Sequence, residues 1–388
     1  VVYRYNENGN DKTANSDTAT NNYKVGLNLS SKVNEDVKFN SRILVGGTDG
    51  GWAANGLNPQ DDADANPGVT LSNAYFGYTG IKNTTVNVGK QGLTTPWTVA
   101  TQVDGNEQTG TGALALSTVG PVTVAVAHFN QTNLGTSGDG LPGAFNDPKP
   151  KQGTLSNADY DAVISRWNAD NADNEGAIGS KSVSTLGVIG AFGPATVDAW
   201  YLNMEDLFNT YTLGAKIANK LSGIDLGADA RYVSLKLDRD INEDGTRDTI
   251  FKVAVTADAG LVDGKLAYAK TGKNGGLTAL DKDASTTLLG WNLNANGKQD
   301  ADYYQAVLGF DILSNLNLSA NYGQIKYESD IDESTKEKET YAQLLYKMSK
   351  NLTTYARYGV LTDKTTDSAG TFENKDNTVG RLQVAYTF

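Results

Sequence analysis

The sequence predicts an all-β fold, namely a transmembrane antiparallel β-barrel of about 18 strands. Three observations predict it: apolar and polar residues alternate along most of the chain, short turns alternate with long polar loops, and no apolar run is long enough for a membrane-spanning helix. A barrel strand needs an apolar residue only at every second position, because its other face lines the interior. The negative mean hydropathy of the chain agrees with this pattern.

Alternation is clear in the final segment, where Leu382, Val384 and Tyr386 share one face. Arg381 and Gln383 share the opposite face. The same period predicts strands at 1–9, 19–32, 36–47, 69–80, 83–92, 110–118, 121–131, 179–192, 194–204, 207–220, 223–237, 248–260, 263–272, 300–314, 316–329, 338–350, 351–363 and 376–388. A barrel of about 16 strands is the alternative if 110–118 and 263–272 are loops.

The connections between these strands differ in length on the two sides. Short ones carry turn residues, as in Gly120-Pro121, Gly193-Pro194 and Ser222-Gly223. Long polar segments lie between them, at 48–68, 93–109, 132–178, 238–247, 273–299 and 364–375. This sorting is typical of a single outer-membrane barrel over residues 1–388, with short periplasmic turns and long extracellular loops.

Composition excludes several functions. The 45 acidic residues exceed the 33 basic ones, for a net charge of −12, which argues against nucleic acid as a partner. There is no cysteine nucleophile, and the single histidine, His128, falls on the apolar face of its strand, so we expect no enzyme. The opening Val1 is interpreted as a processed or trimmed N-terminus.

Several short motifs carry a family resemblance. The terminal Phe388, which closes an alternating strand, resembles the signal by which bacterial barrel-assembly machinery recognises its clients. The more specific motifs are Val2-Tyr3-Arg4-Tyr5, the run from Asp49 to Gly56, Gly89-Lys90-Gln91-Gly92-Leu93, Trp97-Thr98, Val103-Asp104-Gly105, Gly110-Thr111-Gly112 and Arg381-Leu382-Gln383. On these motifs the chain is similar to the Campylobacter-type major outer membrane protein family. The resemblance is densest in the first 112 residues and the last strand, and it implies a trimeric, water-filled outer-membrane porin of eighteen strands.

The resemblance also implies a constriction loop and a calcium ion. The loop at 93–109 would fold into the lumen, with Ca²⁺ near it; Asp104 matches the family's ligand position, and Asp139 is a second candidate. Strand parity independently turns four arginines toward the lumen, which are Arg4, Arg42, Arg357 and Arg381. Asp104 and Glu107 of the loop would face them and create a transverse field. The alternative is that lipid simply excludes the arginines from the outer face.

A second calcium hypothesis concerns residues 238–248. Oxygen-bearing side chains recur there at every second position, and a glycine follows them as in an EF-hand loop. The ligands would be Asp238, Asp240, Asn242 and Asp244. The segment lacks the distal glutamate of that motif, and an ordinary solvated hairpin loop explains it as well.

These observations favour a general diffusion porin in the outer membrane of a Gram-negative bacterium. We expect it to pass small hydrophilic solutes and ions with weak cation preference, to contact outer-membrane lipid, and to form a homotrimer. No cofactor is required, although Ca²⁺ is possible. The alternatives are a substrate-specific outer-membrane channel or, in a different class, a secreted calcium-binding β-sandwich adhesin.

Overall fold

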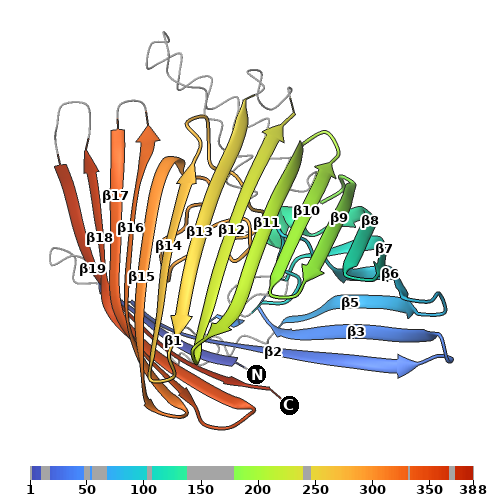
Figure 1. Cartoon of the computed structure of the whole chain (residues 1–388), viewed down its shortest axis with the longest axis horizontal. Coiled ribbons are helices and arrows are strands. Elements are labelled where there is room, and N and C mark those ends of the chain that lie inside the picture. Colours follow the sequence, from blue (N-terminus) through green and yellow to red (C-terminus); the bar gives the residue numbers. More distant parts are fainter. Residues whose placement is uncertain are drawn as a thin grey trace.

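The described residues form one closed antiparallel sheet. The computed structural model describes residues 2–9, 18–47, 53–54, 68–102, 107–137, 179–238, 246–330, 333–366 and 372–387. Apart from the two-residue β4, each strand pairs with the strands before and after it, and β1 (Val2–Gly9) also pairs with β19 (Phe372–Tyr386), which closes the barrel. Figure 1 shows the strands as a wall around the interior, with the N and C ends close together.

Nineteen strands are assigned within the described residues, and β4 (Ala53–Ala54) is a two-residue addition to β2 (Thr18–Lys32). The other strands are β3 (Val37–Gly46), β5 (Gly68–Tyr78), β6 (Thr84–Gly92), β7 (Thr109–Val119), β8 (Val122–Thr132), β9 (Val183–Phe192), β10 (Ala195–Met204), β11 (Phe208–Leu221), β12 (Ile224–Leu237), β13 (Arg247–Asp258), β14 (Val262–Thr271), β15 (Gln299–Leu313), β16 (Leu316–Asp330), β17 (Glu333–Lys347) and β18 (Leu352–Thr366). One short helix, α1 (Leu134–Ser137), follows β8. No helix in the described part of the chain is both long and apolar enough to cross a membrane.

The predicted strands are confirmed, including the two whose loss would have left a smaller barrel, β7 and β14. The largest boundary error is at β17, which begins at Glu333 rather than at 338. Its first residues are mostly charged, so the sequence pattern predicts a loop there. They are strand because the hairpin of β16 and β17 continues beyond the apolar surface, with Lys326 paired opposite Lys336.

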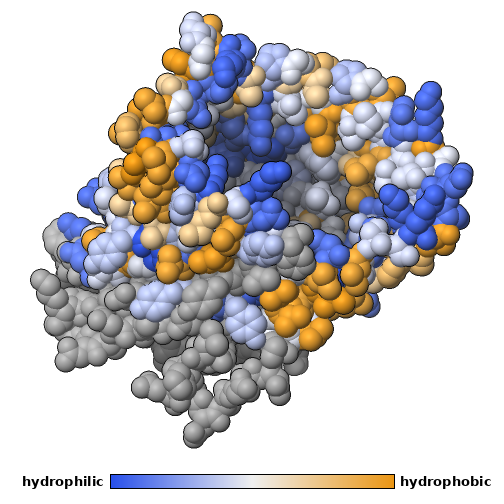
Figure 2. Space-filling view, turned by 90° about the horizontal axis from the view of Figure 1, so that it is seen from below, coloured by the Kyte–Doolittle hydropathy of each residue, from blue (hydrophilic) through white to orange (hydrophobic). Residues whose placement is uncertain are grey.

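Apolar side chains gather on the outer face of the wall. Along β16, Leu318 and Tyr322 are exposed, whereas Ile325 on the opposite parity is fully buried. The same outward face carries Val126 on β8, Leu213 on β11 and many others. In Figure 2, hydrophilic residues surround a hollow, and hydrophobic residues gather on the outside. Alternation therefore separates a lipid-facing surface from a polar interior.

The short turns use the predicted residues. Ser222 and Gly223 join β11 to β12 in the left-handed region, with φ of 51° and 85°. Gly120 and Gly193 make the turns after β7 and β9 with φ of 58° and 60°. Glycine suits these positions because it has no Cβ to clash in that conformation.

Candidate functional site: two loops inside the barrel

The loop after β6 is fastened to the inner face of the wall by an ion pair. Glu107, at the end of this loop, accepts hydrogen bonds from Arg42 of β3, with 2.9 Å from Nε to each carboxylate oxygen and 2.7 Å from Nη2 to Oε1. Ser72 of β5 donates a further bond of 2.7 Å. The Glu107 side chain is 1% exposed and that of Arg42 is 13% exposed. Such a two-pronged pair fixes orientation as well as position.

This contact refines the predicted charge arrangement. Strand parity turns Arg42 inward, as expected, and Asn28 of β2 accepts a bond of 2.9 Å from its Nη1. Glu107, however, touches Arg42 directly instead of facing it across open solvent. The two charges neutralise each other at the wall, so this pair holds the loop and adds little to a transverse field.

Further contacts hold the loop at Gln102 and at its C-terminal end. The amide of Asn133, next to α1, donates to the Glu107 carbonyl (2.8 Å) and accepts from the Thr109 N–H (2.7 Å). Lys24 of β2 donates from Nζ to the Gln102 carbonyl at 3.3 Å. The described parts of 93–108 therefore lie against the inner wall.

A second loop, between β14 and β15, folds against the first. The Leu280 N–H donates to the Trp97 carbonyl (2.9 Å), and Gln108 Nε2 donates to the Leu280 carbonyl (2.7 Å). Gln102 Nε2 donates to Asp281 Oδ2 at 2.9 Å. The two loops, separated by some 180 positions in the chain, are thus joined by backbone and side-chain bonds.

An apolar cluster lies where the loops meet. Trp97 and Leu280 are both fully buried and belong to one core cluster. Its other members from the two loops are Leu93, Leu277, Leu288, Leu293 and Ala295. Burying side chains of this size contributes about 1.5–3 kcal/mol each, so the loops form a packed body inside the barrel. Sequence reasoning missed this, because 273–299 was assigned as an extracellular loop.

The second loop also reaches the wall farther round the barrel. Glu339 of β17 accepts the backbone N–H groups of Trp291 (3.0 Å) and Asn292 (2.7 Å). Lys252 of β13 donates to the Thr287 carbonyl at 2.9 Å. Since the first loop is held at β3 and β5, the two loops together connect distant parts of the barrel wall.

Two predicted arginines meet the second loop. Arg357 and Arg381 are direct cross-strand partners on β18 and β19. Their guanidinium carbons lie 5.7 and 5.9 Å from the centre of the Trp291 ring, and Arg357 also lies 4.5 Å from that of Tyr355. Trp291 packs edge-on against Tyr341 at 5.0 Å. The result is a basic, aromatic surface on one side of the lumen.

The remaining predicted site residues are only partly placed. Arg4 lies in β1 opposite Gln383, next to the two arginines in the closed sheet, but its side chain is outside the description. The candidate calcium ligands Asp104, Asp139, Asp240, Asn242 and Asp244 lie outside the described residues. Asp238 is described just after β12, where its N–H donates to the Leu207 carbonyl at 2.8 Å. Within the described residues, no group of three or more acidic or histidine side chains is arranged to hold a metal ion.

Sequence reasoning also missed an acidic stretch near the short turns. A cavity of about 480 Å³ there is lined by Asp225, Asp258, Asp263 and Lys265, among others. Asn317 of β16 donates to Asp263 at 2.9 Å. The alternation of each strand could have predicted that these carboxylates face the interior, because each lies on the same face of its strand as a buried lumen residue.

Comparisons with known proteins agree with this architecture. The family model described as "Campylobacter major outer membrane protein" matches residues 1–388. A search of curated protein sequences gives no match. Among solved structures, OpdL of Pseudomonas aeruginosa is similar at a TM-score of 0.70 and 17% identity, covering 100% of this chain and 97% of that one.

Two ligand complexes from the same bacterium are similar as well. The outer membrane protein OpdK with vanillate has a TM-score of 0.68 and 14% identity, with 99% and 96% of the two chains covered. OccK2 (OpdF) with glucuronate has a TM-score of 0.69 and 12% identity, again covering 99% and 96%. At this identity the likeness establishes the fold alone.

Proposed function

The chain belongs to the Campylobacter major outer membrane protein family, and from this premise we propose that it is a general diffusion porin. It is an outer-membrane channel of a Gram-negative bacterium and has no catalytic role. In the proposed function, small hydrophilic solutes and ions cross passively through the space that the two lumen loops leave open. As in our sequence-based expectation, three copies would assemble into a trimer.

One observation carries the proposal: the two loops are fixed to the inner wall and to each other. The Arg42–Glu107 ion pair holds the first loop, and the backbone N–H groups of the second loop donate hydrogen bonds to Glu339. A loop body fixed in this way narrows a water-filled barrel to a permanent constriction. A permanent constriction sorts solutes by size and charge without a gating step.

Charge at the constriction and near the turns supports weak cation preference. Arg42 is neutralised by Glu107, and Arg231 of β12 is neutralised by Asp198 of β10 at 2.8 Å. Near the short turns, carboxylates outnumber lysines around the cavity lined by Asp258 and Asp263. Net negative charge near a pore mouth raises the local concentration of cations. The surface around Arg357 opposes this preference and keeps it weak.

Single-channel recording in a planar bilayer under a salt gradient tests the proposal. We expect ohmic conductance steps in groups of three and a small reversal potential in the direction of cation selectivity. A folded, detergent-stable barrel that forms no channels would refute it. Calcium binding by residues 238–248 stays a separate prediction, tested by Ca²⁺ titration of the protein and of its Asp240→Asn variant.

A substrate-specific channel is the second candidate, favoured by the basic, aromatic surface of Arg357, Arg381 and Trp291. Guanidinium groups beside aromatic rings suit planar carboxylates, and two structures of similar fold are complexes with the carboxylates vanillate and glucuronate. Saturable block of ion current by vanillate or glucuronate would favour this candidate. Current that falls only in proportion to solute size would favour general diffusion.

A further inference from the structure

A polar niche lies on the inner wall, on the short-turn side of the point where the first loop is fastened. Six inward-facing residues of three neighbouring strands form it, and the strand pairing aligns them in two rows of three. They are Asn28 and Ser30 of β2, Arg42 and Asn40 of β3, and Asn73 and Tyr75 of β5. Together they line a cavity of about 200 Å³.

The niche carries no net charge. Arg42 is the charged residue among its described lining residues, and it is neutralised by Glu107 at 2.7 Å. Lys32 and Lys38 lie opposite each other one row further toward the short turns, outside the lining. A neutral lining recognises a solute by its hydrogen bonds and shape, because it has no free charge to attract an ion.

Several hydrogen-bonding groups of the niche are unsatisfied by the protein. Asn73 Oδ1 is buried and has no partner among the described residues. Asn28 and Asn40 each accept one hydrogen bond through the amide oxygen, at 2.9 and 3.0 Å. Across the part of the chain that the structure describes, their NH₂ groups and the Tyr75 hydroxyl have no hydrogen-bond partner. Because an unmet buried polar group is unfavourable, the niche gains from a solute that supplies both donors and acceptors.

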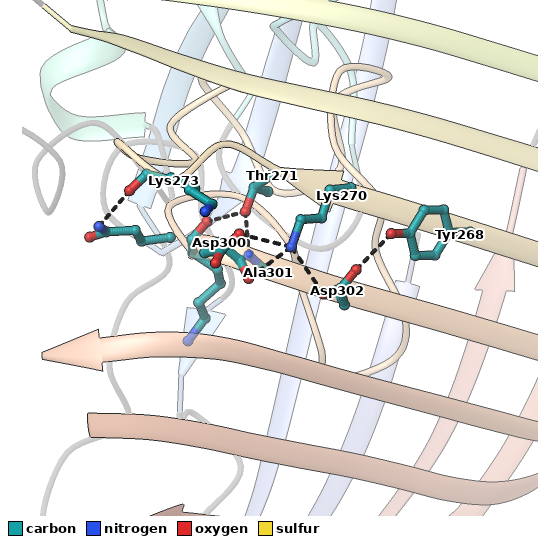
Figure 3. A network of polar contacts seen from close by, with 9 residues as sticks. Tyr268, Lys270, Thr271, Lys273, Asp300, Ala301 and Asp302 are labelled. Carbon is teal, nitrogen blue, oxygen red and sulfur yellow. Dashed lines mark hydrogen bonds and ion pairs between the residues drawn. The ribbon is translucent and has the colours of Figure 1, made fainter. Parts of the chain in front are cut away.

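A polar cluster elsewhere in the barrel shows the contrast. Lys270 Nζ lies 2.8 Å from Asp300 and 3.0 Å from Asp302, and the Tyr268 hydroxyl donates to Asp302 at 2.6 Å. Figure 3 shows how these side chains point toward one another at the neck of the second loop. Such a network satisfies its own groups and needs no further partner, whereas the amides of the niche do not satisfy one another.

We propose that the niche binds a small neutral polyhydroxylated solute, the size of a single sugar ring, as it passes through the lumen. An amide offers both a donor and an acceptor, which hydroxyl groups match, and Tyr75 offers an aromatic face to the C–H groups of such a ring. The cavity equals about seven water molecules at about 30 Å³ each, which suits one ring and not an oligosaccharide. The inference rests on the channel function proposed above, because the solute reaches the niche through the lumen.

The test uses the full chain with D-glucose as the probe. Tetraethylene glycol is the comparison solute, because it is similar in size but has few hydroxyl groups. The variant Asn73→Ala/Tyr75→Phe is compared with Asn321→Ala/Tyr304→Phe, which removes the same groups elsewhere in the barrel. Single-channel current is recorded against solute concentration, and contact with glucose is measured separately by saturation-transfer NMR in detergent. Sugar-free conductance close to that of wild type verifies that each variant is folded.

We expect glucose to lower the current of wild type and of the control variant in a saturable manner. The half-saturating concentration of the niche variant should be roughly tenfold higher, since each lost hydrogen bond lowers affinity by about two- to tenfold. Tetraethylene glycol should lower the current in proportion to its concentration in all three proteins. Saturation that is equal in the two variants would overturn the proposal. So would tighter binding of D-glucuronate than of glucose, because the site would then select an anion through Lys32 and Lys38.

The two readouts separate this inference from the function on which it rests. A folded barrel that forms no channels would refute the diffusion porin, while glucose signals in the NMR experiment that weaken in the niche variant would still support the niche. Normal channels whose current falls only in proportion to glucose, with no saturation transfer, would overturn the niche and leave the porin function intact.

Discussion

The ion pair between Glu107 and Arg42 offers the most direct perturbation of the lumen. Glu107→Gln keeps the shape of the side chain but removes its charge, which leaves Arg42 facing a neutral amide on the inner wall. We expect the loop at 93–108 to detach more often from β3 and β5. The channel should then show larger current fluctuations and a higher mean conductance.

The magnitude follows from the burial of the pair. Breaking a buried ion pair by removing one partner costs about 3–5 kcal/mol. Arg42 retains some solvent contact and its bond to Asn28, so we expect a smaller loss of about 2–3 kcal/mol. That corresponds to a change of roughly 30- to 150-fold in the ratio of attached to detached loop.

The assay combines single-channel recording with urea unfolding in detergent. Arg42→Met/Glu107→Gln serves as the second variant, because it leaves no unpaired charge and should be less perturbed than Glu107→Gln alone. Asp36→Asn, in an exposed turn, controls for the loss of one negative charge. If Glu107→Gln matches wild type in current noise and stability, or if the double variant is as perturbed as the sum of its parts, the ion pair does not hold the loop.

Three further predictions concern other parts of the barrel. Glu339→Gln weakens the acceptor of two backbone N–H groups. It should lower the free energy of unfolding, measured by urea titration, by about 1–3 kcal/mol, and it should raise the channel conductance. Unchanged stability and conductance would contradict the role of Glu339 in holding the second loop. Asp258→Asn/Asp263→Asn should move the reversal potential toward zero, and a shift toward stronger cation selectivity would contradict the acidic-mouth argument. Gly112→Val should prevent folding, because a Cβ at this position meets the His128 carbonyl oxygen. The folded barrel, which migrates differently from the heat-denatured chain on a gel, should then be absent. Gly264→Ala is the control and should fold normally, because there is space for a methyl group.

Period-two alternation was sufficient to locate nearly every strand, because one face of each must be apolar to contact lipid. Turn residues such as Gly193 and Ser222 then located the short connections. Parity also turned Arg42 toward the interior, and the family resemblance placed Glu107 in a loop that enters the same interior. It could not give the distance between them, since parity fixes the face of a strand and not the path of a loop.

The inward fold of the second loop escaped prediction for a related reason. Leu277, Leu280 and Leu288 are buried, but they follow no strand or helix period, and the surrounding Asn, Asp and Gly residues are typical of solvated loops. A usable signal was present in the number of leucines and the tryptophan, Trp291, within a segment assigned to solvent. Large apolar residues that recur in a long loop indicate that the loop packs against something.

The pairing of β1 with β19 has a consequence for assembly. Val2 lies opposite Ala385, so this hydrogen-bonded seam joins residues separated by almost the entire chain. The other long strands pair with strands that are close in sequence. The chain entropy lost on closing so long a loop grows only logarithmically with its length, so closure is slow chiefly because it must wait for all the hairpins. Until then two strand edges stay unpaired, and such edges readily join other chains. The seam is therefore the step at which biogenesis of this barrel is most exposed to aggregation.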